Sequence, residues 1–466
     1  MHQYITSQSL QINHIMKKLY FLSLLCTATF LLHAQWTGNK KINTLVANAN
    51  SSDIQTTNTD DGKTWVAFYS QHGANYDMRV QLLDVNGMRL FGDSGFVVSN
   101  KKSGSATYVF NVCVDNNNCL IIGFQFQQGS TMECILQKVT PQGNLPWGDG
   151  VDLGAGLSPY PTTLTTNEIA VAWNNNGKIN YQKVSEAGIA AWQPAKIFTG
   201  NSGHGVSRGQ LVRGTKGVFT MVYQDQFSAP FYTNLFAQRF DNNGNAIWSA
   251  ARQISTLTTV SYRYYDVIGD GDTTYVGYYG NPSGSNRFDA YVQKINPGGF
   301  LPWKINGVAF ADYSSPNDPS EQTIYIAKRN LAPNIWAVCT LTNPDQTMSG
   351  VYAQQIDAGS GKRSLGKNAK EIFPISARLT SLAFANLVLP ENFPEFLVTD
   401  TSNRLAATAL KNDGSFLWRD TVFVLGGTRN AKSRYGITQP YFGKMVAVWQ
   451  EDKGNGDMPY AEQFVI

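Results

Sequence analysis

A segment that repeats along the chain constrains its fold more than any other feature. The clearest copy runs from Phe236 to Trp248 and reads FAQRFDNNGNAIW, a β-type stretch followed by a turn and a tryptophan. Two further clear copies run from Tyr291 to Trp303 and from Ile135 to Trp147, and weaker ones begin near Arg79, Asn180, Tyr352, Ala406 and Tyr460. The unit recurs about every 54 residues, which indicates one supersecondary unit stacked many times.

Each unit is predicted to hold four short antiparallel strands. In the second unit we expect them at Thr107–Val114, Cys119–Phe126, Glu133–Thr140 and Trp147–Leu153. Asn, Asp and Gly separate them, and these residues tolerate the left-handed backbone of tight hairpins. The chain has 42 glycines, 12% aromatic residues and only 15% charged residues, and we see no sustained helical periodicity after the N-terminal segment. An all-β class follows.

The two ends of the chain predict a closed ring. The last unit supplies strands near Tyr435–Pro440, Lys444–Gln450 and Tyr460–Ile466 but lacks a fourth. The N-terminal stretch Gln35–Val46 resembles the outer strand of another unit, Ile247–Ile254, and so fits that place. An N-terminal strand in the last unit leaves no unpaired sheet end. We therefore predict an eight-bladed β-propeller of four-stranded antiparallel blades, closed by an N-terminal strand in the last blade.

The repeats resemble those of Bacteroidetes-type secreted tandem-repeat β-propeller proteins. The shared pattern is Tyr-Ala-Gln-Lys/Arg-Ile/Val-Asp, then a glycine turn, then Leu-Trp. The resemblance covers essentially all of the chain after the N-terminal segment. It implies a secreted propeller and says almost nothing of activity, because propellers serve as enzymes, lectins and scaffolds alike.

The N-terminus is typical of a secretory signal peptide. Lys17 and Lys18 precede an apolar run from Leu19 to Leu32, and a small-residue site follows at Ala34. The run is shorter than the about 20 residues that a membrane anchor needs. We expect residues 1–34 to be removed, with Met16 as the true start, and residues 35–466 to form one propeller domain. The protein is then secreted, periplasmic or on the cell surface, with no membrane span in the mature chain.

Charge and cysteine usage exclude several function classes. The formal net charge is +4 without a Lys/Arg cluster, so we expect no nucleic-acid partner. Four cysteines follow the signal peptide, namely Cys113, Cys119, Cys134 and Cys339. A Cys113–Cys119 or Cys119–Cys134 disulfide and buried free thiols are all compatible with the sequence. The spacings match no zinc pattern and only His72 and His204 remain, so we expect no metal site and no cofactor.

Four motifs have structural interpretations. The recurring glutamine, as at Gln137, is predicted to bond backbone within or between blades rather than to bind ligand. The recurring tryptophan, as at Trp248, is predicted to pack between blades. The stretch Asn58–Trp65 resembles the Asp-box of sialidase-type propellers, but here it joins the first two strands of a blade and is interpreted as a β-turn. The acidic segment Asp266–Asp272 could hold calcium, but it is better explained by Asp-Gly turns.

The function favoured by the sequence is that of an extracytoplasmic binding or scaffold protein for a glycan or another surface protein. The alternative is a carbohydrate-active enzyme, such as a glycoside hydrolase, a sialidase-like enzyme or a lyase. An enzyme should carry carboxylates or arginines on the first strands, which line the axis. Segments such as Tyr160–Thr165 are instead rich in Thr and Leu, which favours a protein without catalytic activity.

The candidate ligand site lies on loops entering and leaving blades four and five. The loop Asp225–Tyr232 holds three aromatic residues that no hairpin needs, and His204 and Tyr262 fall beside it in blade order. Rings and fixed donors on adjacent loops suit sugar or peptide recognition. The alternative is that these rings pack into local cores. The candidate residues are His204, Arg208, Asp225, Phe227, Phe231, Tyr232, Tyr262, Arg263 and Tyr264.

Overall fold

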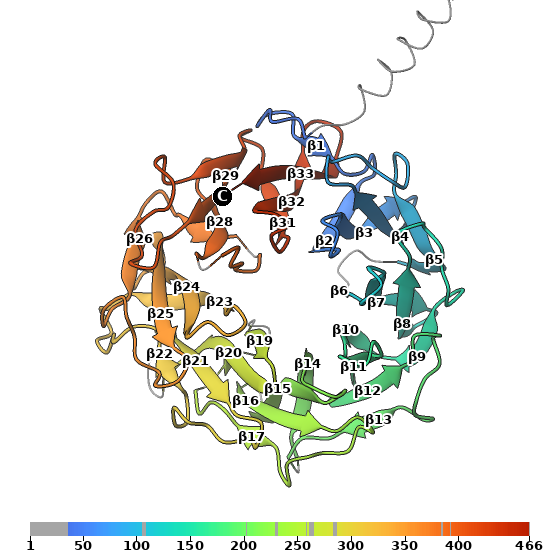
Figure 1. The fold of residues 1–466 in the computed structure, drawn as a ribbon, viewed down its shortest axis with the longest axis horizontal. Coiled ribbons are helices and arrows are strands. Elements are labelled where there is room, and N and C mark those ends of the chain that lie inside the picture. The colour runs from blue at the N-terminus through green and yellow to red at the C-terminus, as the bar shows by residue number, and fades with distance from the viewer. Residues whose placement is uncertain are drawn as a thin grey trace, which may run out of the picture.

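The chain folds into a closed ring of β-sheets. The computed structural model describes residues 36–465 apart from 105–108, 202, 229–231, 258, 261–264, 283–286, 384 and 392. Eight antiparallel sheets stand around one axis, and in each the strands follow one another outward from that axis (Figure 1). The predicted eight-bladed propeller of four-stranded blades is confirmed. No helix in the described part of the chain is long and apolar enough to cross a membrane.

The blades follow the chain in order. Blade one holds β2 (Ser51–Asn58), β3 (Thr64–His72), β4 (Asn75–Leu83) and β5 (Phe96–Ser103), and blade two holds β6 (Asn111–Val114), β7 (Leu120–Gln128), β8 (Thr131–Val139) and β9 (Val151–Ala155). Blade three holds β10 (Leu157–Thr163), β11 (Ile169–Asn175), β12 (Lys178–Val184) and β13 (Lys196–Phe198), and blade four holds β14 (Gly205–Arg213), β15 (Phe219–Ser228), β16 (Tyr232–Phe240) and β17 (Arg252–Gln253), with β18 (Thr259–Val260) beside β16. Blade five holds β19 (Asp266–Asp270), β20 (Thr273–Gly280), β21 (Asp289–Ile295) and β22 (Val308–Ala309), and blade six holds β23 (Ser320–Ala327), β24 (Asn334–Thr342), β25 (Ser349–Asp357) and β26 (Lys370–Ser376). Blade seven holds β27 (Ser381–Leu382), β28 (Glu395–Thr399), β29 (Leu405–Ala409) and β30 (Phe423–Gly426), and blade eight holds β31 (Lys432–Ile437), β32 (Lys444–Asp452), β33 (Asp457–Val465) and β1 (Thr44–Leu45).

The last blade combines the two ends of the chain. Strand β1 runs antiparallel to β33, with Thr44 opposite Ala461 and Leu45 opposite Tyr460 (Figure 1). The N–H of Val46 extends the ladder to the carbonyl of Pro459 at 2.9 Å. The predicted closure by the N-terminal strand is therefore confirmed.

The predicted strand bounds in the second unit are close to those of β6 to β9, with one clear difference. The outer strand begins at Val151 rather than at Trp147. Two tight turns occupy the intervening residues, because Gly148 N–H bonds Leu145 O and Gly150 N–H bonds Trp147 O. Both glycines have positive φ, which suits these turns and not a regular strand.

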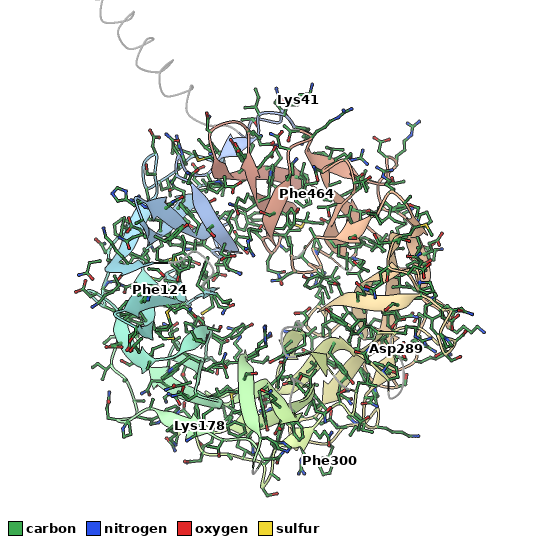
Figure 2. All side chains as sticks on the ribbon, turned by 180° about the vertical axis from the view of Figure 1, so that it is seen from behind. Lys41, Phe124, Lys178, Asp289, Phe300 and Phe464 are labelled. Carbon is green, nitrogen blue, oxygen red and sulfur yellow. The ribbon has the colours of Figure 1, made fainter. Side chains whose placement is uncertain are left out.

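Eight apolar clusters fill the eight junctions between neighbouring blades in the described part of the chain. At the junction of blades eight and one, Val46 and Ala47 of the N-terminal segment are fully buried with residues of both blades. Figure 2 shows side chains filling the wall of the ring, with the buried Phe124 and Phe464 inside it and the exposed Phe300 at its outer edge. The core of the protein is therefore the sum of these junctions.

The recurring tryptophans pack between blades, as predicted. Trp248 of blade four donates its Nε1 hydrogen bond to Pro297 O in the outer turn of blade five at 2.9 Å. A Cβ at Gly299 of that turn would lie 3.0 Å from the Trp248 ring, so only glycine fits beneath it. The same contact pairs Trp36 with Gly87, Trp147 with Gly188, Trp192 with Gly244, and Trp303 with Gly361.

The recurring glutamines satisfy backbone groups, as predicted. The Gln137 amide donates to Gly148 O at 2.9 Å within its own blade and to Val98 O at 2.9 Å in blade one. Its oxygen accepts the N–H of Lys138 at 2.9 Å. The same two hydrogen bonds recur in other blades. The side-chain NH2 donates to a carbonyl of the outer segment, and the side-chain oxygen accepts the N–H of the next residue, at Gln81, Gln182, Gln238, Gln293 and Gln354.

The four cysteines in the described part of the chain are free thiols, so both disulfide alternatives are wrong. The register places Cys113 opposite Ile121 and Cys134 opposite Gln125, which separates each proposed partner from Cys119. Burial raises the pKa of Cys113 to about 12 and, less strongly, that of Cys119 to about 11. These thiols are therefore protonated at neutral pH and unreactive as nucleophiles.

Candidate functional site

The ring has two chemically different faces. Turns from first to second and from third to fourth strands emerge on one side, which we call the turn face. Hairpins from second to third strands, and the connections between blades, emerge on the opposite side, which we call the loop face. The described residues among those predicted from the sequence, namely His204, Arg208, Asp225, Phe227 and Tyr232, belong to the loop face of blade four.

A buried carboxylate organises the loop face of blade four. Asp225, near the end of β15 and opposite Val206, has an exposed fraction of 1%. It bonds the imidazole Nδ1 of His204, which ends the connection from β13 to β14. The side-chain amide of Asn201, in the same connection, donates to the other carboxylate oxygen at 3.0 Å. The structure thus brings together two of the sequence-predicted residues.

The contact with Asp225 fixes the chemistry of His204. A carboxylate only accepts hydrogen bonds, so the Nδ1 of a neutral His204 carries the proton and its Nε2 carries a lone pair. The His204 side chain is 32% exposed, whereas that of Asp225 is 1% exposed. The pair can therefore present an oriented imidazole to a sugar hydroxyl or to a proton that is removed in a reaction.

Arg208 lies four residues further along, at a β-bulge in β14. The bulge falls between Ser207 and Gln210, and Arg208 adopts a left-handed backbone with φ of 55°. Its N–H donates to the side-chain oxygen of Asn174 in blade three at 2.9 Å, and its carbonyl accepts the Tyr265 hydroxyl from blade five. Bulges of this kind re-aim side chains near binding sites.

First strands near this bulge carry charged and phenolic groups. Asp266 begins β19 and accepts the N–H of Ile326 at 2.8 Å, and burial raises its pKa to about 6. Burial also raises the pKa of Tyr160 on β10, and the Asp266 charge adds to that effect. Burial raises the pKa of Tyr265 too, but the Arg208 charge opposes it. These groups from blades three, four and five form one electrostatic cluster.

The expectation of first strands without carboxylates or arginines is therefore wrong for part of the ring. It describes β10, but β14 and β19 carry Arg208 and Asp266. Blades one and eight are joined by an ion pair of 2.9 Å between Asp53 and Arg434, both in bulges of their first strands. The expectation was based on the composition of single strands, and these charged residues come together only when neighbouring blades pack.

The other predicted residues are placed less completely. The backbones of Phe227 and Tyr232 form the end of β15 and the start of β16, and β18 pairs with β16 at Tyr232 and Thr233. That pairing brings the chain just before Tyr262 beside the blade-four hairpin. Phe231 and Tyr262–Tyr264, including Arg263, lie outside the described residues, and their role stays a prediction.

Several site residues were not found from the sequence, namely Asn174, Asn201, Tyr160 and Tyr265, while Asp266 was considered only for calcium. Asn201 and Asp225 are joined across the β13–β14 connection and the β14–β15 pairing, and Tyr160 and Asp266 lie two blades apart. No fixed spacing in the sequence marks either interaction, because each one forms only when the strands and blades pack together.

The acidic segment of blade five does not gather its carboxylates. Asp266 bonds Ile326 N–H, Asp270 pairs with Lys328 at 2.5 Å, and Asp272 pairs with Arg239 at 2.6 Å. No group of three potential metal ligands occurs within the described ranges. The Asn58–Trp65 stretch is the turn between β2 and β3, as expected from the sequence, with Gly62 at φ of 83°.

Comparisons with known proteins find only distant structural similarity at low identity. No family model and no curated protein matches the chain. Among solved structures, the polysaccharide lyase Uly1 is 9% identical with a TM-score of 0.49, over 91% of this chain and 99% of that chain. A PL25 ulvan lyase bound to -[GlcA(1-4)Rha3S]- is 10% identical with a TM-score of 0.49, over 91% and 95%. The GH93 α-L-arabinofuranosidase of Fusarium graminearum is 10% identical with a TM-score of 0.41, over 68% and 98%.

Proposed function

We propose that this protein is an extracytoplasmic propeller that binds a glycan on its loop face, around His204 and Arg208. The observation that carries the proposal is the buried Asp225 carboxylate, which holds His204 and Asn201 in fixed orientations. Burying a carboxylate costs folding free energy unless hydrogen bonds replace its hydration. The bonds from His204 and Asn201 to Asp225 therefore fix these two side chains in place. Preorganised polar groups are what sugar hydroxyls require.

The distribution of apolar groups supports a glycan over a protein ligand. A protein interface usually has an apolar centre larger than a few side chains. The exposed large apolar residues on the described loop face include Val109, Leu157 and Leu379, which enter three different blades. Charged and amide groups instead gather at the blade-four site, where Arg208 favours a glycan with an acidic group.

A carbohydrate lyase or hydrolase is the second candidate, and one observation favours it. A histidine oriented by a buried carboxylate is suited to act as a general base. Asp266, with its pKa raised to about 6, is suited to exchange a proton near neutral pH. Both groups lie toward the loop-face side of blades four and five.

Glycan binding and turnover can be separated in one experiment. Residues 35–466 are applied to a glycan array and incubated with a panel of neutral and acidic polysaccharides, with products followed by reducing ends and by absorbance of unsaturated sugars. We expect saturable binding to an acidic glycan without products. Turnover would establish the enzyme alternative, and no bound glycan would contradict both.

Export is part of the proposal and has its own measurement. Expression of the full chain with its native N-terminus, followed by fractionation and N-terminal sequencing, should give a protein that begins at Gln35 outside the cytoplasm. A cytoplasmic protein that retains residues 16–34 would contradict it.

A further inference from the structure

A pocket lies on the turn face, on the opposite side of the ring from His204. It has a volume of about 300 Å³ and is lined by the first turns of blades eight and one. We call it the seam pocket, because the N-terminal and C-terminal blades of the chain meet there. Its walls come from Asn58–Thr64 and Thr438–Lys444, with Val85 and Gln463 beside them.

The blade-eight turn presents an aromatic ring to solvent. Tyr441 and Lys444 exchange backbone hydrogen bonds of 2.9 and 3.0 Å around Phe442 and Gly443. Both central residues are left-handed, with φ of 46° and 71°, and this turn type strongly favours Asn, Asp or Gly. Phe442 is nevertheless there, with an exposed fraction of 86%.

Folding of the turn does not explain Phe442. The corresponding turns of blades one, two, three and five place a glycine or asparagine in the left-handed position, namely Gly62, Asn118, Asn167 and Gly271. In blade four Lys216 and Gly217 are both left-handed, as Phe442 and Gly443 are in blade eight, but lysine keeps its charged end in water. A phenylalanine there adds steric strain to the backbone, and its exposed ring gains no burial energy on folding to offset that strain. Blade six also departs from the pattern, but there Leu331 is an aliphatic residue, 92% exposed and outside the pocket.

The seam pocket is held in shape by contacts between its two walls. The N–H of Gln439 donates to the side-chain oxygen of Asn58 at 3.1 Å, which joins the two turns. The Tyr441 ring lies against Gly62 so closely that any Cβ there would overlap it. Tyr441 and Phe442 meet edge to face, with ring centroids 4.7 Å apart. The aromatic wall is thus preorganised.

Polar groups of both kinds surround these rings. The Asp61 carboxylate, paired with Lys63, supplies acceptors, Lys444 supplies a donor, and the exposed Gln439 amide supplies both. Sugar hydroxyls donate and accept at once, and a pyranose has one apolar face that stacks on an aromatic ring. A volume of about 300 Å³ is at the lower end of the range for small-molecule pockets.

We infer that the seam pocket binds one pyranose residue or a disaccharide, with Phe442 stacked against the apolar face of the sugar. Gln439, Lys444 and Asp61 bond its hydroxyls. The site is independent of the loop-face site, since no residue is shared between them. With both sites occupied, one protein molecule would hold sugars on opposite faces of the ring.

The probes are the methyl pyranosides of glucose, galactose, mannose and rhamnose, studied by saturation-transfer NMR and titration with residues 35–466. We expect at least one to bind the parent protein. Phe442→Asn should weaken that affinity by about tenfold or more, because stacking is lost, while melting at the same or a higher temperature. Phe442→Trp should retain binding.

Two matched variants make the result specific. Leu331→Asn makes the same kind of change in the blade-six turn and should bind like the parent. His204→Ala should also leave pyranoside binding unchanged, so loss of the loop-face site is distinguishable from loss of this one. Absence of binding to all four pyranosides, or parent-like affinity in Phe442→Asn, would overturn the inference.

Discussion

The turn face and the loop face of the ring are built on opposite plans. On the turn face, neighbouring turns repeat one contact, as in the bonds from Asp60 N–H to Asn118 at 2.7 Å and from Asn116 N–H to Asn167 at 3.0 Å. On the loop face the connections differ from blade to blade, and one of them joins His204 to the buried Asp225. Repetition on the turn face fixes the ring, whereas the connections of the loop face vary and one of them builds the site at His204.

Truncation tests the largest consequence of this comparison, because ring closure supports both faces. Deleting residues 35–46 removes the β1 ladder and the buried Val46, and it opens the core between blades eight and one. We expect a loss of more than about 3 kcal/mol in the free energy of unfolding, seen as a lower midpoint in urea. A truncated protein that unfolds like the parent would contradict closure by this strand.

Trp248→Ala tests one repeated junction on the turn face. The ring is 5% exposed and packs on Gly299, so its removal leaves a cavity and an unpaired Pro297 carbonyl. The expected loss is about 3–5 kcal/mol in urea unfolding. Exposed Phe300→Ala, in the same outer turn, is the control and should change stability little. Equal effects of the two substitutions would mean that the repeated contact does not stabilise the ring.

Glu395→Gln tests a position on the turn-face side of blade seven where a buried carboxyl group lowers stability at neutral pH. Glu395 is fully buried at the start of β28, and burial raises its pKa to about 8 from a usual 4.5. The folded state therefore holds a proton that the unfolded state releases, so stability falls as pH rises from about 4.5 to about 8. The variant should lose this fall, on the order of a few kcal/mol, in urea unfolding at pH 5 and pH 8. If Glu395→Gln kept the same pH dependence of stability as the parent, Glu395 would not be the group responsible.

The sequence predicts the repeated contacts of the ring better than the contacts of the loop face. Gln137 and Trp248 recur at fixed positions in the unit and make the same contacts in each blade, so the repeat predicted both the ring and their roles. His204 and Asp225 were selected from the sequence as loop residues, but their pairing depends on the register of β14 with β15. Asp266 and Tyr160 influence each other only because blades three and five face a common axis. No local pattern encodes that relation.

The affinity of the best array glycan for His204→Ala, compared with His72→Ala, tests the central claim most directly. His72 ends β3 on the loop face of blade one and is exposed, so its replacement is the same chemical change on the same face, far from Asp225. The account predicts at least about tenfold weaker binding for His204→Ala, with an unchanged melting temperature and parent-like affinity in His72→Ala. Equal affinity of the two variants would contradict a glycan site at His204.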